Sequence, residues 1–179
     1  MVLYRSLVNG CNSNKRSRLN ELDYDKIPYE KMPSGTVIQH VRNQTRANGH
    51  MTTTSGSFVD LSYSVSITPH FSNSMMLVEW QGIAQQPNTV AGVSIITVYR
   101  NNTTNLGDTT GFNGMSATGD FSGSGGVYVT ATNNFFLYDE PGNRDTVSYH
   151  LWGRTQGGGT AYPSHNGVTN CLSVKEIRR

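Results

Sequence analysis

The chain has 179 residues, a net charge of +2, and only 15% charged and 35% hydrophobic residues. An ordinary globular domain carries about 25% charged residues, so this surface is poor in charge. So small an excess of Lys and Arg excludes a dedicated nucleic-acid binder, whose affinity grows with the number of phosphates it neutralises. Gly, Ser, Thr and Asn instead make up about two fifths of the chain, and these residues favour turns and strand edges over helix interiors.

Cysteine usage and hydropathy narrow the class further. The two cysteines, Cys11 and Cys171, are too few for a disulfide framework, so we expect two free thiols. No apolar segment approaches the roughly 20 residues that span a bilayer, and the N-terminus lacks the apolar core of a secretory signal. We therefore expect a protein made in the cytoplasm, without a membrane partner.

The first part of the chain differs from the rest in charge. Residues 1–35 hold six Lys/Arg and four Asp/Glu, whereas residues 36–179 hold eight of each. No acidic residue precedes Glu21, so the stretch before it is basic. Its basic side chains are Arg5, Lys15, Arg16 and Arg18. This boundary predicts an N-terminal extended arm, residues 1–35, in front of a neutral domain, residues 36–179.

A short helix is predicted inside this arm. Leu19 and Leu22, with Ser17 as a candidate N-cap, fit one or two helical turns that end before Pro28. So short a helix is marginal alone and would become ordered by docking onto a neighbour. The basic residues together with Leu19 and Leu22 are therefore candidates for anchoring the chain to an acidic groove of a partner protein. Contact with nucleic acid is the weaker alternative, because three clustered charges bind phosphate only weakly.

The domain begins with strand patterns. Residues 61–68 alternate between apolar side chains and Ser or Thr, which predicts a strand with one buried and one solvated face. Pro69 closes this strand, since proline cannot donate to a ladder. Residues 75–80 and 93–99 are nearly continuous in apolar side chains, which predicts strands in the middle of a sandwich.

The second half of the domain is less regular at first. Residues 101–126 are rich in Asn, Thr, Ser and Gly, and we expect mainly loop there. A hairpin is predicted across Pro141-Gly142, between an apolar run at 135–138 and a strand at 146–152. A glycine-rich break at 156–160 and a last strand at 171–177 follow. Six to eight strands at this spacing predict an all-β fold, a single β-sandwich of jelly-roll type.

The polar residues show no pattern typical of catalysis or metal binding. The five histidines show no metal-ligand spacing, and His150 is expected to face solvent from its strand. Asp139 and Glu140 are adjacent in a turn, which points them apart rather than across a cleft as in a glycosidase. No Gly-x-Ser-x-Gly elbow or phosphate-binding glycine loop is present. The sequence therefore predicts a protein that is not an enzyme and has no catalytic residue, metal site or cofactor.

Aromatic side chains leave a binding function open. Trp80 and Trp152 are expected in the core, whereas Tyr162 lies between Gly159 and Pro163 and is the better candidate for an exposed ring. Exposed rings beside Asn and Asp are typical of sugar-binding sites. Tyr162, Asn113 and Asp120 are accordingly candidate glycan contacts, in loops 101–126 and 156–166.

Several short motifs occur together along residues 33–179 and resemble a C-terminal β-sandwich domain of tailed-phage virion and fibre proteins, particularly those of marine phages and cyanophages. The matching segments are Pro33–Gln39, Ser57–Ser62, Val65–Pro69, Ser74–Val78, Asp139–Gly142, Thr146–Tyr149 and Leu172–Ile177. The resemblance implies a compact sandwich that assembles as a homotrimer and exposes variable loops. It carries over no catalytic residue.

Sequence and resemblance together favour a non-enzymatic virion structural protein, displayed on the particle surface as a knob, short fibre or head decoration. Its expected partners are other virion proteins, in the capsid, the portal or adaptor, or the tail. A tail-fibre adhesion module that binds a host surface polysaccharide is the alternative, and an enzyme that cuts such a polysaccharide comes third.

Overall fold

The computed structural model describes residues 28–46, 51–86, 92–107, 114–119, 129–164 and 167–179. The chain divides into two units, Met1–Thr36 and Val37–Arg179, and each is described by itself. In the described part of the first unit, the 3-10 turn η2 (Tyr29–Lys31) follows Pro28. The helical turns predicted before Pro28 lie outside the described residues.

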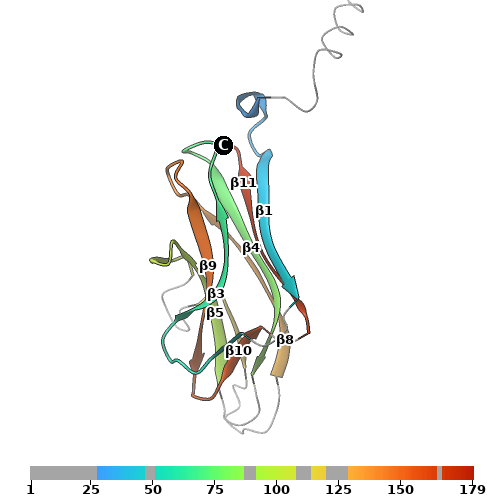
Figure 1. Ribbon diagram of the computed structural model, residues 1–179, viewed down its shortest axis with the longest axis vertical. Helices are drawn as coiled ribbons and strands as arrows, with labels where there is room; N and C mark the ends of the chain where they lie inside the picture. Colours follow the sequence, from blue (N-terminus) through green and yellow to red (C-terminus); the bar gives the residue numbers. More distant parts are fainter. Residues whose placement is uncertain (1–27, 47–50, 87–91, 108–113, 120–128, 165–166) are drawn as a thin grey trace, which may run out of the picture. The chain divides into compact units, whose positions relative to one another are not determined.

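The second unit is built from strands packed as two layers (Figure 1). The strands are β1 (Val37–Arg46), β2 (Met51–Thr53), β3 (Val59–Ile67), β4 (Met75–Gln86), β5 (Val93–Arg100), β6 (Thr104–Asn105), β7 (Ser116–Gly119), β8 (Val129–Asp139), β9 (Val147–Gln156), β10 (Ala161–Ser164) and β11 (Thr169–Ile177). All ladders between them are antiparallel in the part of the chain that is described. The predicted all-β sandwich is confirmed.

The strand order is that of a jelly roll. One sheet runs β1-β11-β4-β8, with β10 and β2 extending it along β4, and the other runs β3-β9-β5, with β6 and β7 both on β5. If β6 and β7 are counted as one strand and the short β2 and β10 are left out, eight principal strands remain. Numbered in chain order, they form sheets of order 1-8-3-6 and 2-7-4-5. Most consecutive strands therefore lie in opposite sheets. Among the described strands, only β5 pairs with the strands that follow it directly. The first and last strands, β1 and β11, are neighbours.

This topology corrects the hairpin predicted across Pro141-Gly142. The strands on either side do not pair: β8 pairs with β4, whereas β9 pairs with β3 and β5 in the other sheet. Gly142 has a φ of 76°, so the turn chemistry was identified correctly. A tight turn fixes a reversal of the chain, but it does not fix whether the chain returns in the same sheet.

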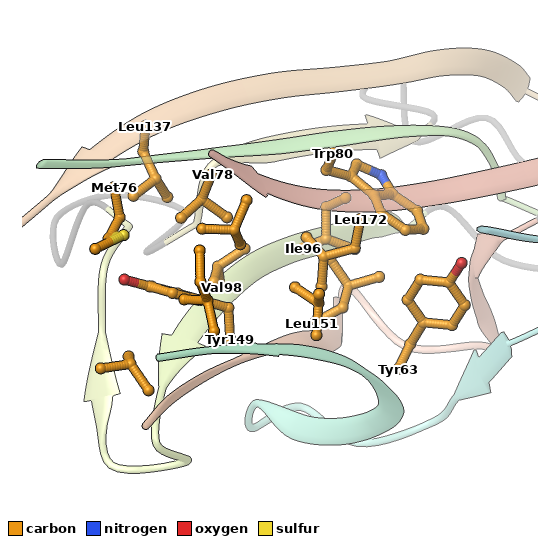
Figure 2. Close-up of a cluster of buried hydrophobic side chains, with 14 residues drawn as sticks. Tyr63, Met76, Val78, Trp80, Ile96, Val98, Leu137, Tyr149, Leu151 and Leu172 are labelled. Carbon is orange, nitrogen blue, oxygen red and sulfur yellow. The ribbon is translucent and has the colours of Figure 1, made fainter. Parts of the chain in front are cut away.

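The core lies between the sheets and follows the period-2 alternation of the strands (Figure 2). From one sheet, β4 contributes Met76, Val78 and Trp80, and from the other, β9 contributes Tyr149 and Leu151. All five side chains are fully buried. The predicted core position of Trp80 is confirmed, and its ring meets Tyr63 edge-on at 5.6 Å between centroids.

The loop-rich stretch 101–126 contains two short strands. Both β6 and β7 pair with β5 and cover different parts of its edge, at Tyr99–Arg100 and at Val93–Ile96. Residues 108–113 and 120–126 of this stretch lie outside the described residues. The stretch therefore supplies the outer edge of the second sheet, which its composition did not indicate.

Gly82 in β4 lets the Trp80 ring and the Asn170 side chain lie closer to the backbone than any residue with a Cβ atom would allow. A Cβ atom at this position would lie 2.5 Å from the Trp80 ring and 2.9 Å from Oδ1 of Asn170. Both neighbours are buried and cannot move without disturbing the core. The indole ring therefore occupies the space that a side chain at position 82 would need.

We expect Gly82→Ala to lower the free energy of unfolding by about 1–3 kcal/mol, because the added methyl group overpacks the site. Gly56→Ala is the matched control, since nothing lies within 4 Å of the Cβ it would add. Urea unfolding of both variants measures the difference. Equal stability of the two variants would contradict this account of Gly82.

Candidate interaction surface

Strand β8 presents two large apolar side chains to solvent. It is an outermost strand, and β4 is its only ladder partner among the described residues. Its alternation turns Phe135 and Leu137 toward the core and Phe136 and Tyr138 outward. Phe136 is 66% exposed and Tyr138 57% exposed, and their rings meet edge-on with centroids 6.3 Å apart. We call Phe136 and Tyr138 the β8 aromatic pair.

The charged groups around the β8 aromatic pair are paired with one another. Phe136 lies opposite Glu79 of β4, and the Glu79 carboxylate accepts from Lys175 Nζ at 2.7 Å. At the end of β8, Glu140 forms an ion pair with Arg179. The rim of the aromatic pair is therefore electrically balanced.

A shallow hollow of about 330 Å³ lies beside Phe136 on this sheet. It is lined by Glu79, Trp80, Gln81, Asn134, Phe135 and Phe136. Its polar groups are amides and one carboxylate that is already paired. Such a lining suits contact with another surface more than the chemistry of a reacting group.

The opposite edge of the same sheet, β1, is protected. A β-bulge interrupts its pairing with β11 between Val37 and Gln39, and the exposed side chains that follow include His40 and Arg42. Bulges and outward charges discourage a sheet edge from pairing with another chain. By contrast, β8 pairs with β4 over residues 129–139 without a register shift.

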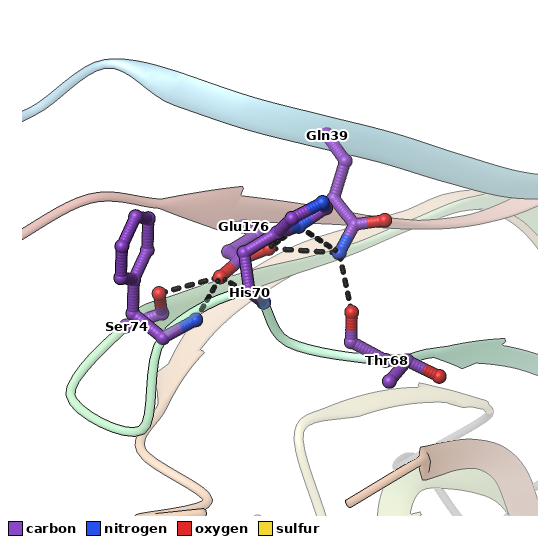
Figure 3. Close-up of polar contacts among 6 residues, drawn as sticks. Gln39, Thr68, His70, Ser74 and Glu176 are labelled. Carbon is purple, nitrogen blue, oxygen red and sulfur yellow. Dashed lines mark hydrogen bonds and ion pairs between the residues drawn. The ribbon is translucent and has the colours of Figure 1, made fainter. Parts of the chain in front are cut away.

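A buried carboxylate joins three segments near the start of β1 (Figure 3). Glu176 of β11 is fully buried, and its oxygens accept from Ser74 Oγ at 2.6 Å, from Gln39 Nε2 at 2.8 Å and from the backbone N–H of His70 at 2.8 Å. The Phe71 N–H donates to the same carboxylate at 3.2 Å, and His70 Nδ1 lies 3.0 Å from it. We call these five residues the Glu176 cluster.

The protonation of Glu176 follows from these contacts. Burial alone would raise the pKa of its carboxyl, but the hydrogen bonds from Ser74, Gln39, His70 and Phe71 outweigh burial. They hold the pKa of Glu176 below its ordinary value, so the carboxylate is charged at neutral pH. Four donors from the protein thus contact this fully buried carboxylate, and these contacts hold β1, β11 and the segment from His70 to Ser74 together.

A second buried carboxylate, Asp139, also accepts hydrogen bonds from protein donors at both oxygens. Its two oxygens accept from Arg100 Nη1 and from the Tyr149 hydroxyl, each at 2.8 Å. Burial and the nearby Asp139 charge raise the pKa of Tyr149, which stays protonated and donates. The structure thus ties the end of β8 to β5 and β9 across the sandwich.

The outer face of the second sheet carries a partly buried aromatic group. Trp152 stacks on Tyr99 with centroids 4.1 Å apart and donates from Nε1 to Asn102 Oδ1 at 3.0 Å. The predicted core position of Trp152 is therefore wrong: it alternates outward, between the buried Leu151 and Gly153. His150 also faces outward, but it is only partly exposed and lies 3.3 Å from Asp60.

The predicted site residues are only partly within the description. The anchoring candidates Arg5, Lys15, Arg16, Arg18, Leu19 and Leu22 lie outside the described residues, as do the glycan candidates Asn113 and Asp120. Tyr162 is partly exposed, and it lies in strand β10 opposite Gln85 of β4 rather than in a loop. The anchoring and glycan contacts stay predictions.

Sequence reasoning missed the two features that distinguish this structure, although signals for both were present. Four consecutive apolar residues at 135–138 in a strand must place two of them on the solvent side, because side chains alternate. In the last strand, Glu176 has the same parity as Leu172 and Val174, which places it in the core with them.

Metal-binding clusters and membrane-spanning helices are both absent from the described residues. These residues contain no group of three or more His, Cys, Asp or Glu side chains that could hold a metal ion. Within the same residues, no helix is long and apolar enough to cross a membrane.

Comparisons with known proteins add little. No protein-family model and no curated protein matches the chain. Among solved structures, it is similar to the VP2 subviral particle of infectious bursal disease virus, with 13% identity, 85% of this chain and 45% of that chain covered, and a TM-score of 0.35. The Gx strain of the same virus gives 12% identity, coverage of 86% and 46%, and a TM-score of 0.29. The chain thus spans less than half of either protein, and likeness this low carries no argument about function.

Because of the Glu176 cluster, we expect the folded protein to lose stability in acid. The pKa of Glu176 is lower in the folded chain than the value of about 4.3 of an unfolded glutamate. The contribution of the carboxylate to the free energy of unfolding is therefore complete above about pH 4.3, and it is lost as the pH falls through the folded pKa. We expect Glu176→Gln to be about 2–4 kcal/mol less stable than the wild type at pH 7. This difference should shrink below about pH 4.

Thermal unfolding from pH 7 to pH 3 measures this loss. Glu140→Gln is the control, since Glu140 is exposed and its ion pair with Arg179 lies at the surface. The account is wrong if both variants lose equal stability, or if the Glu176→Gln deficit stays constant across the pH range.

Proposed function

We propose that this protein is a non-enzymatic structural component of a virus particle, displayed on the particle surface as a knob, short fibre or head decoration. Residues 1–35 would hold it there by docking onto another virion protein. The proposal rests first on the resemblance of residues 33–179 to virion domains of tailed phages. The jelly-roll order of the strands supports it as an analogy of fold, since jelly rolls recur in viral capsid and lectin domains.

One observation in the structure supports the non-enzymatic part of the proposal. The buried carboxylates Glu176 and Asp139 are occupied by protein hydrogen-bond donors, while Phe136 and Tyr138 stand exposed on a sheet edge. A catalytic carboxylate needs lone pairs that are available to a substrate. An exposed apolar group on a rigid sheet instead suits contact with another macromolecule.

Incorporation into particles tests the anchoring role. We expect Lys15→Ala/Arg16→Ala to lower the amount of protein in purified particles at least several-fold, because the arm loses charge that faces an acidic partner. Arg42→Ala/Arg144→Ala is the control, since it removes the same charge from exposed positions of the domain. Quantitative immunoblotting with an antibody against residues 37–179 provides the measurement.

Immunogold labelling of intact particles with the same antibody tests surface display. Gold on the particle surface is the expected result. Absence of the protein from purified particles would overturn the proposal, and equal incorporation of the two double variants would overturn the role of the arm.

A further inference from the structure

The two edges of the β1-β11-β4-β8 sheet differ in a way that calls for an explanation. An outermost strand exposes unpaired N–H and C=O groups and is a template for pairing unless charge, proline or a bulge protects it. Strand β1 has a bulge and outward His40 and Arg42. Strand β8 has no charged residue, proline or glycine from Val129 to Tyr138, and no register shift.

We propose that the edge of β8 is an interface at which two copies of this chain pair antiparallel about a twofold axis at Leu137. The two sheets would then join into one continuous sheet. A twofold interface uses the same surface of both copies, so each residue on one side has a counterpart on the other. This inference does not depend on the virion role proposed above.

The register follows from the positions of the aromatic side chains. With the axis at Leu137, Phe136 of each copy lies opposite Tyr138 of the other, on the same outer face. The pairing then covers residues 135–139 and ends before Pro141, which has no N–H to donate. Four rings would meet across the axis, and aromatic cross-strand pairs stabilise a sheet.

The neighbouring strands leave this half of β8 accessible. Strand β7 contacts β8 and pairs with Val93–Ile96, the first residues of β5. Both β5 and β8 begin at the end of the sandwich where β4 finishes, so β7 covers the beginning of β8. Residues 135–139 lie toward the other end of the strand. An axis at Asn134 would use the covered half and place the rings opposite Thr130 and Thr132.

Charge supports a second copy as the occupant. In the proposed register, Asp139 faces Phe135 and Glu140 faces Asn134, so no like charges oppose each other. The nearby Glu79 and Glu140 are already paired with Lys175 and Arg179. A partner with a strong net charge would find no complementary excess here, whereas the β8 aromatic pair is its own apolar complement.

The surface area buried between the two copies indicates how stable the dimer is expected to be. Burying the exposed parts of four rings removes roughly 500 Å² from water, taking about 200 Å² for each whole ring. This is less than half of the about 1,200 Å² of a small specific interface. The ladder and its flanks must supply the rest, so we expect a dimer that dissociates on dilution.

Sedimentation equilibrium of the full chain from about 1 to 200 µM tests the proposal. We expect the mass to rise from that of the 19.6 kDa chain to twice that value. Phe136→Lys and Tyr138→Lys should each weaken association at least tenfold, because each removes a ring from both sides of the contact and places two like charges diagonally across the twofold axis. Val37→Lys is the matched control: Val37 is 48% exposed on the protected edge, and this variant should associate like the wild type.

Cysteine cross-linking tests the register separately from stability. Asn134→Cys/Glu140→Cys should form a covalent dimer under mild oxidation much faster than either single variant, because the pairing sets position 134 against position 140, both exposed, and this variant keeps all four rings. The wild type is the control, because any cross-linking that it shows must come from the native Cys11 and Cys171. The proposal would be overturned if the wild type stayed monomeric at 200 µM or formed a trimer. It would also be overturned if a single cysteine variant cross-linked fastest.

Discussion

An open sheet leaves one side of each outermost strand without a hydrogen-bonding partner, and this constraint governs where polar and apolar groups lie in the second unit. Strand β3 is interrupted by a bulge between Asp60 and Tyr63, where Ser62 has a φ of 57°. Strand β1 has its own bulge. Short strands β6 and β7 cover the edge of β5. Strand β8 alone, among the long outermost strands described, carries an uninterrupted edge with exposed rings.

The interior depends on contacts between segments far apart in sequence. The jelly-roll order places β1 beside β11, so the chain must close its sheet with its last strand. The Glu176 cluster fixes this closure, because it links β1 and β11 to the connection between β3 and β4. Tyr63 reinforces it from the other sheet: its hydroxyl lies 2.9 Å from the carbonyl oxygen of Asn43 and 3.0 Å from that of Asn170.

Strand existence could be predicted from the sequence because alternation is a local property. The predicted strand at residues 61–68 corresponds to β3, and the strand predicted at residues 146–152 corresponds to the first part of β9. Which strands pair could not be predicted, since Pro141-Gly142 specifies a turn whether the chain stays in its sheet or crosses. The outward position of Trp152 was missed for a related reason: a large apolar side chain suggests burial, but the parity of its strand decides its face.

The candidate surface was partly predictable. Parity assigns Phe136 and Tyr138 to one face of a strand, but the sheet order is needed to show that this strand is outermost. The exposed fractions of the two rings show that the described residues leave this face open to solvent. The same holds for Glu176, whose parity indicates burial but whose donors come from residues more than 100 positions away. Residue patterns thus identify what needs a partner, and topology identifies the partner.

Hydrogen–deuterium exchange of the full chain at two concentrations tests most directly the claim that β8 is a contact edge. The account predicts that amides within residues 134–139 exchange more slowly at 200 µM than at 2 µM, while β1 amides exchange at the same rate in both samples. Exchange in β8 that does not change with concentration would contradict it.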